Sequence, residues 1–308
     1  LDYRDLWQHI SIRALGTRMF SSDSWSKHEG WTSTVNEWRY WDIIAMRDLY
    51  DFADIVDEYA SENGIVGDRT WALRDTETGK LISAKRPRLW RAMLDCSATG
   101  VGDDVVVTVP SGESFGIGDP GLPLALEALF GRTVAVEASS EPMQGTYESD
   151  WPEIDGITLA GEMEFPTNLT GEGTSFVDLG ILHLLTTTSM ASIAAANGEV
   201  TVDHRRFRPS ILLDTPELSG FPENDWNGQT LTIGAGDDAV VISLGEPAPR
   251  CVMTTVAQGD LPREAAVLQT IAAENKLTNP LGTFACLGCY ASVETGGTIH
   301  AGAPVTLT

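Results

Sequence analysis

Short segments with strand character, separated by turn-forming residues, recur from residue 64 to the end of the chain, and no other feature limits the fold as strongly. Their β-branched and apolar residues favour strands, whereas stretches such as TETG and PSGES favour turns. Helical periodicity interrupts them at 121–131, 189–197 and 263–275. The sequence therefore predicts a mainly β protein with several helices, in the α+β class. The predicted strands lie at 70–75, 80–85, 104–110, 133–138, the start of 179–190, 204–214, 231–234, 239–245, 250–256, 289–294 and 297–308.

Residues 1–62 differ from the rest, because they hold five of the nine tryptophans and one long helical pattern. Thr34 and Glu37 have the spacing of a capping box, and apolar positions recur every three or four residues until Asn63 and Gly64. The pattern predicts an amphipathic helix over 34–62. Its apolar stripe must pack on the rest of the chain or on a second copy, unless the helix is an appendage without bearing on the site.

Composition divides the remainder into two units. Residues 63–145 form a β-rich module, and 146–172 are rich in Glu, Gly, Pro and Thr without periodicity, which predicts a linking loop. The strand pattern then resumes, so the predicted domains are 1–62, 63–145 and 146–308.

The formal net charge of −24 comes from 44 acidic against 20 basic residues. Such a surface repels phosphate backbones and anionic headgroups, which argues against binding to nucleic acids or membrane surfaces. No apolar run approaches the roughly 18 residues of a membrane-spanning helix, and no secretory signal is evident. We therefore expect a cytoplasmic location.

The four cysteines at 96, 251, 286 and 289 are too few and too unevenly spread for a disulfide framework, so we expect reduced thiols. Cys286 and Cys289 form one CxxC motif, which lacks half the ligands of a structural zinc site. A redox dithiol is one interpretation; two half-buried strand residues are the favoured one.

Two arginine-containing motifs are candidates for chemistry. In a strand, Arg206 and Arg208 of HRRFRPS would share a face, with either an internal carboxylate or an external oxyanion as their partner. Arg250 precedes Cys251, and a neighbouring cation favours the thiolate that attacks electrophiles or binds a soft metal. A small buried cysteine is the plainer interpretation of Cys251, as a core histidine is of His183.

Several separated motifs together resemble the MOSC domain, the C-terminal domain of molybdenum-cofactor sulfurases. They are RRFRPSILLDTP, FPENDWNGQTLTIG, PRCVMTT, LGCYASV and GTIHAGAPVTL. Upstream, GIVGDRTWALRDTETGKLISAKRPRL is similar to the β-barrel module that precedes MOSC in the mitochondrial amidoxime-reducing component and its bacterial relatives. The resemblance implies a MOSC β-barrel preceded by a smaller β-barrel-like module. The chain departs from the family in lacking a YPVKS-type loop and in carrying Ala303 where aspartate is usual.

The resemblance also implies a molybdenum cofactor (molybdopterin) site, with Cys251 as the metal ligand and catalytic residue. Arg208 would bind the pterin phosphate, and Ser210 would add a polar contact. We expect the site between the two modules, because Arg69 belongs to the first and the other residues to the second. The further implied cofactor-binding residues are Arg69, Asp178, Gly180, Pro249, Arg250 and Tyr290.

In function, the resemblance implies an oxidoreductase that reduces N-hydroxylated or N-oxide small molecules. The sequence shows no iron–sulfur cysteine set and no flavin motif, so electrons would come from a separate partner protein. Two alternatives stay open: a sulfurtransferase with Cys251 as persulfide carrier, and a protein that binds or delivers the cofactor. The sequence leaves the oligomeric state open.

Overall fold

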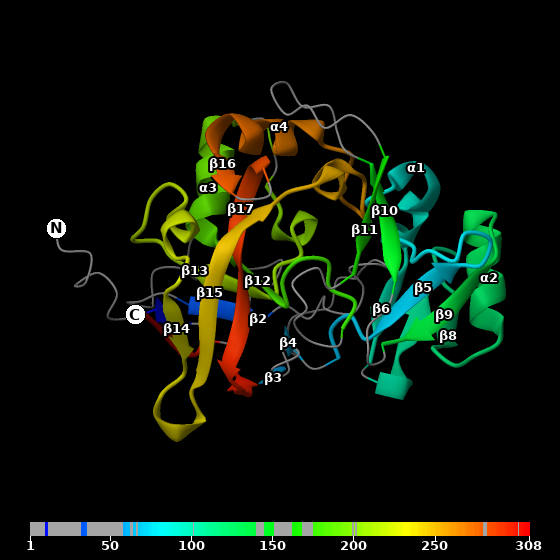
Figure 1. Cartoon of the computed structure of the whole chain (residues 1–308), viewed down its shortest axis with the longest axis horizontal. Helices are drawn as coiled ribbons and strands as arrows, with labels where there is room; N and C mark the ends of the chain where they lie inside the picture. Colours follow the sequence, from blue (N-terminus) through cyan, green and yellow to red (C-terminus); the bar gives the residue numbers. More distant parts are fainter. Residues whose placement is uncertain are drawn as a thin grey trace.

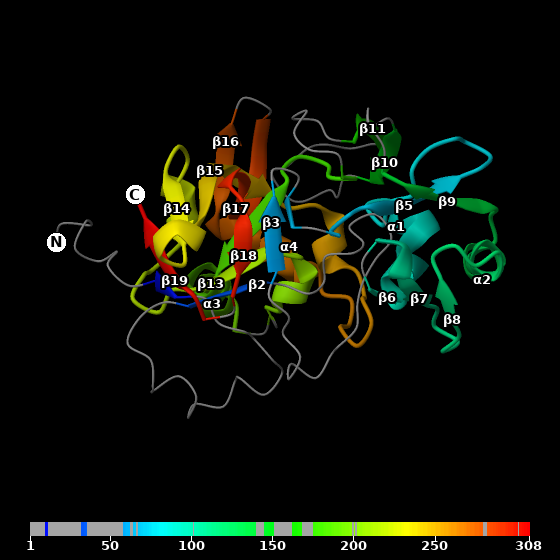
Figure 2. The same ribbon diagram turned by 90° about the horizontal axis from the view of Figure 1, so that it is seen from below.

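The computed structural model describes residues 10–11, 32–35, 58–61, 64–65, 67–100, 102–139, 145–150, 162–167, 175–198, 200, 202–279, 282–300 and 302–308. The fold is mainly β and belongs to the α+β class, as predicted. Two parts lie side by side in both views (Figures 1 and 2). Within the described residues there are four helices: α1 Pro87–Trp90, α2 Gly121–Phe130, α3 Thr187–Ala196 and α4 Ala265–Glu274.

The part that contains the C-terminus is built on a curled, largely antiparallel sheet in which only β12 and β13 are seen to pair in parallel among the described strands. The strand order is β1-β19-β14-β15-β17-β12-β13-β2, with β16 also paired to β17. Most of these strands come from the last 130 residues of the chain. Their bounds are β1 Ile10–Ser11, β2 Thr32–Val35, β12 Leu182–Thr186, β13 Ile211–Asp214, β14 Thr230–Ile233, β15 Val240–Pro249, β16 Lys276–Asn279, β17 Gly282–Thr295 and β19 Pro304–Leu307.

Helices α3 and α4 are held on this sheet by apolar side chains. Ile193 of α3 and Ile271 of α4 are fully buried in one cluster with Leu185, Leu212 and Leu287 of the sheet. Each helix has a side-chain cap: Thr186 accepts from the Ser189 N–H, and Glu264 accepts from the Ala266 N–H. A second cluster joins the buried side chains of β12, β13, β14, β15 and β19 with Trp226, which is 1% exposed. These two cores hold the strands of the sheet together.

The other part, called the first part below because it precedes most of the large sheet in the chain, consists of small sheets around its own core. Buried Leu73, Met93, Leu122 and Leu126 belong to this core, and α2 ends at Gly131, whose φ of 68° is the left-handed cap that glycine favours. β5 Trp71–Asp75 pairs with β9 Val134–Ala138, and β10 Thr146–Asp150 pairs with β11 Glu162–Pro166. In a third sheet, β7 Val106–Thr108 lies between β6 Ser97–Thr99 and β8 Ser114–Gly116.

The helix predicted over 34–62 is wrong at both of its ends. Residues 32–35 form β2, which pairs with β13, and β3 (Glu58–Ser61) pairs with β18 (Gly297–Ile299) and β4 (Gly64–Ile65). Residues 36–57 lie outside the described residues. β1 pairs with β19, so described pieces of 1–62 complete the C-terminal sheet; pairing with distant strands overrides the local periodicity.

Four other local predictions are corrected. The expected loop 146–172 contains the β10–β11 hairpin, and the expected strand at 80–85 is reduced to single bridges at Leu81. Residues 204–206 and 252–255 form 3-10 turns, where strands were predicted. Pro209, which follows the first turn, has no N–H for a strand ladder. In both turns side chains bond to nearby backbone groups: Asp203 accepts from the Arg205 N–H, and the Thr254 and Thr255 hydroxyls donate to the carbonyls of Cys251 and Val252.

Within the described residues, none of the helices is both long and apolar enough to cross a membrane.

Candidate functional site

Strand β15 carries Arg250 and Cys251 to the end of the C-terminal sheet that faces the other part of the molecule. Pro249 is the last residue of the strand and pairs with Cys286 of β17, and the Arg250 N–H donates to the Ala285 carbonyl at 2.8 Å. Cys251 follows in extended conformation and begins the 3-10 turn at 252–255. Its side chain is half-buried, whereas the other three cysteines are buried.

Arg69 and Arg208 adopt an unusual backbone conformation. They are the two non-glycine residues of the described chain with positive φ, at 54° and 46°. A left-handed conformation costs a residue with a β-carbon about 1 kcal/mol or more, and such residues concentrate at functional sites. Arg69 lies in the turn after β4, and Arg208 follows the 3-10 turn at 204–206.

Asp68 joins these two arginines. The Arg208 Nη2 donates to Asp68 Oδ1 at 2.6 Å, and the Arg69 Nη1 lies 3.6 Å from Asp68 Oδ2. All three side chains are largely buried. One carboxylate therefore serves the guanidinium of its neighbour Arg69 and that of Arg208, which is 140 positions away from Asp68 in the chain.

A second carboxylate, Asp178, binds a further cation, Lys85, and also feels the charge of Arg69. The Lys85 ammonium is hydrogen-bonded to Asp178 Oδ2. Burial opposes ionisation of Asp178, but Lys85 and Arg69 outweigh it and hold the pKa of this carboxyl well below its usual range. Lys85 also donates to the Tyr147 hydroxyl at 3.2 Å, and burial raises the pKa of Tyr147 to about 12 although Lys85 opposes the shift.

Cys251 lies within the electrostatic reach of this network. Burial raises the pKa of its thiol above the ordinary value, and the positive charges of Lys85 and Arg250 oppose the shift only in part. Arg250 thus favours the thiolate, as expected, but desolvation outweighs its charge and leaves the pKa of Cys251 raised in the protein without a metal. A bound metal ion would displace the proton.

The remaining predicted residues pack around the same point. The Arg250 guanidinium donates to the carbonyls of Phe207 and Ala248, each at 3.2 Å. Gly180 lies against the Tyr290 ring, where a β-carbon would approach the ring to 2.6 Å. The Ser210 hydroxyl accepts from the His183 N–H at 3.1 Å.

We call one set of these groups the junction cluster, because its members come from both parts of the molecule. It comprises Asp68, Arg69, Lys85, Asp178, Arg208, Arg250 and Cys251. The structure thus brings the predicted residues together, with Pro249, Gly180, Ser210 and Tyr290 beside the cluster. It combines anion-binding side chains with the one cysteine of the chain that is half-buried, the other three being buried.

Arg206 does not belong to this cluster. It is 4% exposed, and its guanidinium donates to the carbonyls of Thr254, Val256 and Pro262. The expectation that Arg206 and Arg208 share one face is wrong, because residues 204–206 form a turn in which side chains do not alternate. Arg208 has the internal carboxylate, Asp68, that was one of the two expected partners.

His183 is the buried core histidine that the sequence suggested, at 3% exposed. Its Nε2 lies 3.2 Å from the Leu287 carbonyl oxygen, and its ring meets that of Tyr290 edge to face. Burial first, and then the charges of Arg250 and Arg69, hold its pKa well below the usual value. It is therefore neutral near pH 7, and it supports the site by packing.

The two cysteines of the CLGC motif are not reactive groups of the site, because both are buried and protonated. Cys286 and Cys289 are 1% and 0% exposed on β17, so they are buried strand residues, where half-buried ones were expected. Burial raises the pKa of Cys286 to about 11 and that of Cys289 well above its usual value. Thiols in this state are poor nucleophiles.

Sequence reasoning missed Asp68, Lys85 and Tyr147. Asp68 stands beside Arg69 in the GDR motif, so that motif could have indicated it. Lys85 and Tyr147 carry no local signal, because they are separated from Asp178 and from each other by long stretches of chain and meet only in the folded protein.

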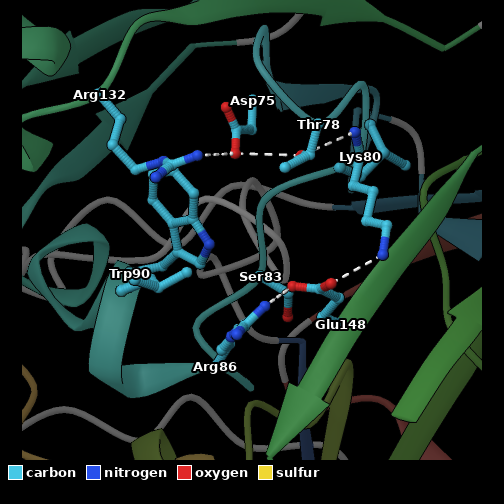
Figure 3. A pocket seen from close by; sticks show the side chains of 10 residues that line it. Asp75, Thr78, Lys80, Ser83, Arg86, Trp90, Arg132 and Glu148 are labelled. Atoms are coloured by element: carbon cyan, nitrogen blue, oxygen red, sulfur yellow. Dashed lines mark hydrogen bonds and ion pairs between the residues drawn. The ribbon is translucent and has the colours of Figure 1, made fainter. Parts of the chain in front are cut away.

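A separate pocket of about 310 Å³ lies within the first part (Figure 3). Glu148 bridges Lys80, at 2.7 Å, and Arg86, while Arg132 pairs with Asp75 at 2.8 Å and lies over the Trp90 ring. Its lining is Asp75, Thr78, Lys80, Leu81, Ser83, Arg86, Leu89, Trp90, Arg132 and Glu148. None of these ten is a predicted site residue.

Comparison with known protein families finds a match in the C-terminal part of the chain. Residues 174–306 match the MOSC domain, so this part of the chain is a MOSC domain. The YuaD protein from Bacillus subtilis is similar at 14% identity and a TM-score of 0.32, over 44% of this chain and 68% of that one. YiiM from Geobacillus stearothermophilus is similar at 18% identity and a TM-score of 0.28, over 42% of this chain and 54% of that one. No curated protein matches the chain.

Proposed function

We propose that the MOSC domain at residues 174–306 binds a molybdenum cofactor at the junction cluster and uses it as an oxidoreductase. The observation that carries this proposal is the meeting of Arg69, Arg208, Asp178, Arg250 and Cys251 at one place. These residues come from four separate segments of sequence, and two of them hold costly backbone conformations there.

The side chains of the cluster suit such a cofactor chemically. Guanidinium and ammonium groups bind phosphate by charge-assisted hydrogen bonds, and the planar fork of Arg208 fits two oxygens at once. Cys251 offers a sulfur ligand to a soft metal centre. Asp68 and Asp178 would hold the cations in place, and the carbonyls of Phe207 and Ala248 would orient Arg250 beside Cys251.

For the reaction, we propose two-electron reduction of N-hydroxylated or N-oxide small molecules. The bound cofactor would supply the oxygen-accepting and redox chemistry, while the protein supplies binding, orientation and a partly desolvated site. The half-buried Cys251 marks where a substrate would approach. Electrons would come from a separate partner protein in the cytoplasm, because the four cysteines make no iron–sulfur set.

The test is the Cys251→Ser variant, produced beside the wild type in a host that makes the cofactor. The substitution keeps the size of the side chain and replaces a soft ligand by a hydroxyl that stays protonated. We expect molybdenum in the wild type, and a loss of at least about 100-fold in reduction of an N-hydroxylated substrate in the variant. Circular dichroism checks that the variant is folded.

Two results would contradict the proposal. Full activity of Cys251→Ser would exclude ligation by this residue. If the wild type carries a cyanide-labile sulfur and no molybdenum, the protein is a sulfur carrier and the proposed oxidoreductase function is wrong.

A further inference from the structure

We infer that Lys85 is a further binding residue of the site, through which the first part of the molecule holds the anionic end of the cofactor; this inference rests on the proposed function. Neither the MOSC match, which begins at residue 174, nor the motifs of the sequence include Lys85 as a site residue. Its case comes from its place in the fold.

The backbone of Lys85 is fixed on two sides. The turn at 83–86 is closed by the Arg86 N–H, which donates to the Ser83 carbonyl at 3.0 Å. The Lys85 N–H donates to the Ser83 hydroxyl at 3.2 Å, and the Lys85 carbonyl accepts from the Asp150 N–H at 2.8 Å. The turn is thereby attached to β10, which lowers the entropy lost when the side chain is ordered.

The side chain then crosses from the first part of the molecule to the second. Its ammonium lies 4.7 Å from the centre of the Tyr147 ring, donates to the Tyr147 hydroxyl and meets Asp178, which precedes β12. The Lys85 side chain is 13% exposed. Packing and hydrogen bonds thus hold a positive charge at the surface where the two parts meet, and a preorganised charge of this kind binds an anion well.

Lys85 also extends the set of cations in the junction cluster. Asp68 pairs with Arg69 and Arg208, and Asp178 pairs with Lys85 and feels the charge of Arg69. The charge of Lys85 is felt at Cys251. A phosphate-bearing ligand whose metal lies at Cys251 would therefore have the ammonium within reach.

Lys80 provides a matched control, because it is a lysine of the same part with two carboxylate partners. Its Nζ lies 2.7 Å from both Glu148 and Glu164, and it faces the pocket of Figure 3. Its side chain is 28% exposed. Loss of its charge should not affect a ligand at the junction cluster.

The experiment measures molybdenum and pterin per chain after extensive dialysis of the wild type, Lys85→Gln, Lys85→Arg and Lys80→Gln. Loss of a charge-assisted contact weakens binding by about tenfold or more. After this dialysis, we expect Lys85→Gln to retain at most about a tenth of the wild-type cofactor. Lys80→Gln should retain all of it. Rescue by Lys85→Arg, which keeps the charge, distinguishes binding from a purely structural role.

The results test the role of Lys85 and the proposed function separately. If the wild type and Lys85→Gln contain equal amounts of cofactor, this inference is overturned and the proposed function stands. A wild type without cofactor overturns both. Should Lys85→Gln fail to fold, Lys85→Met keeps the apolar stem over the Tyr147 ring, and its loading is read by the same criteria, with melting temperature as the folding control.

Discussion

The junction cluster and the pocket of Figure 3 are built from the same kinds of side chain, yet their charges are arranged differently. In the pocket, Glu148 bridges Lys80 and Arg86 within one part of the molecule, and its side chain is 23% exposed. In the cluster, Asp68 bridges Arg69 and the distant Arg208, and its side chain is 7% exposed. The bridging carboxylate of the pocket is therefore more exposed to solvent than that of the cluster.

The difference shows where binding energy is available. Water screens the part-exposed pairs of Glu148, so these ion pairs of the pocket contribute little. In the cluster, desolvation strengthens each interaction and makes each broken pair expensive. The strained backbones of Arg69 and Arg208 lie in the cluster as well. We therefore assign the candidate function to the cluster and treat the pocket as a matched comparison.

The largest expected difference between the two regions is in the free energy of unfolding after removal of the bridging carboxylate of each, Asp68 in the cluster and Glu148 in the pocket. Asp68→Ala leaves Arg69 and Arg208 buried without their shared carboxylate, which should lower the free energy of unfolding by about 3 kcal/mol or more. Glu148→Ala opens a more exposed pair and should cost about 1 kcal/mol or less. Urea denaturation of both variants measures the two values, and equal costs would remove the distinction between the regions.

Replacement of one arginine in each region should separate binding from stability. Arg208→Gln removes a phosphate-binding fork and should reduce retained molybdenum and pterin about tenfold. Arg132→Gln loses the pairs with Asp75 and Glu77 and the contact with Trp90, and it should leave cofactor content unchanged. Metal analysis of purified protein checks both, and a loss of cofactor in Arg132→Gln would argue that the pocket belongs to the site.

The smallest expected effect is a difference in acid sensitivity. Because Lys85 and Arg69 hold the folded-state pKa of Asp178 below its ordinary value of 3.8, its ionised form stabilises the protein above that pH. This contribution is lost as the pH falls through the lower, folded-state pKa. Asp178→Asn should therefore flatten the fall in melting temperature between pH 6 and pH 3 by about 2 °C or more.

Glu164 supplies the control for this measurement. Its hydrogen bond from Lys80 lowers its pKa as well, but the carboxylate is exposed. Glu164→Gln should leave the pH profile of the melting temperature as in the wild type. Identical profiles for all three proteins would show that Asp178 gains nothing from its neighbours.

Local sequence signals predicted the elements whose causes are local. The helix at 265–274 and the strand at 71–75 follow their own periodicity, and Gly131 ends α2 as a C-cap glycine should. These elements could be predicted because the interactions behind them span only a few residues. Arg69, Arg208, Arg250 and Cys251 were expected because the motifs that contain them resemble those of a known family.

Contacts between distant segments decided the remainder. The periodicity of 34–62 predicted a helix, but pairing with β13 and β18 makes strands at its two ends. Arg206 and Arg208 are two positions apart, yet one is bound by backbone carbonyls and the other by Asp68, because the chain turns between them. Lys85 meets Asp178 across 93 residues. The sequence by itself determined which residue types the site has available, and the tertiary structure decided which of them meet, because burial and long-range pairing depend on the whole fold.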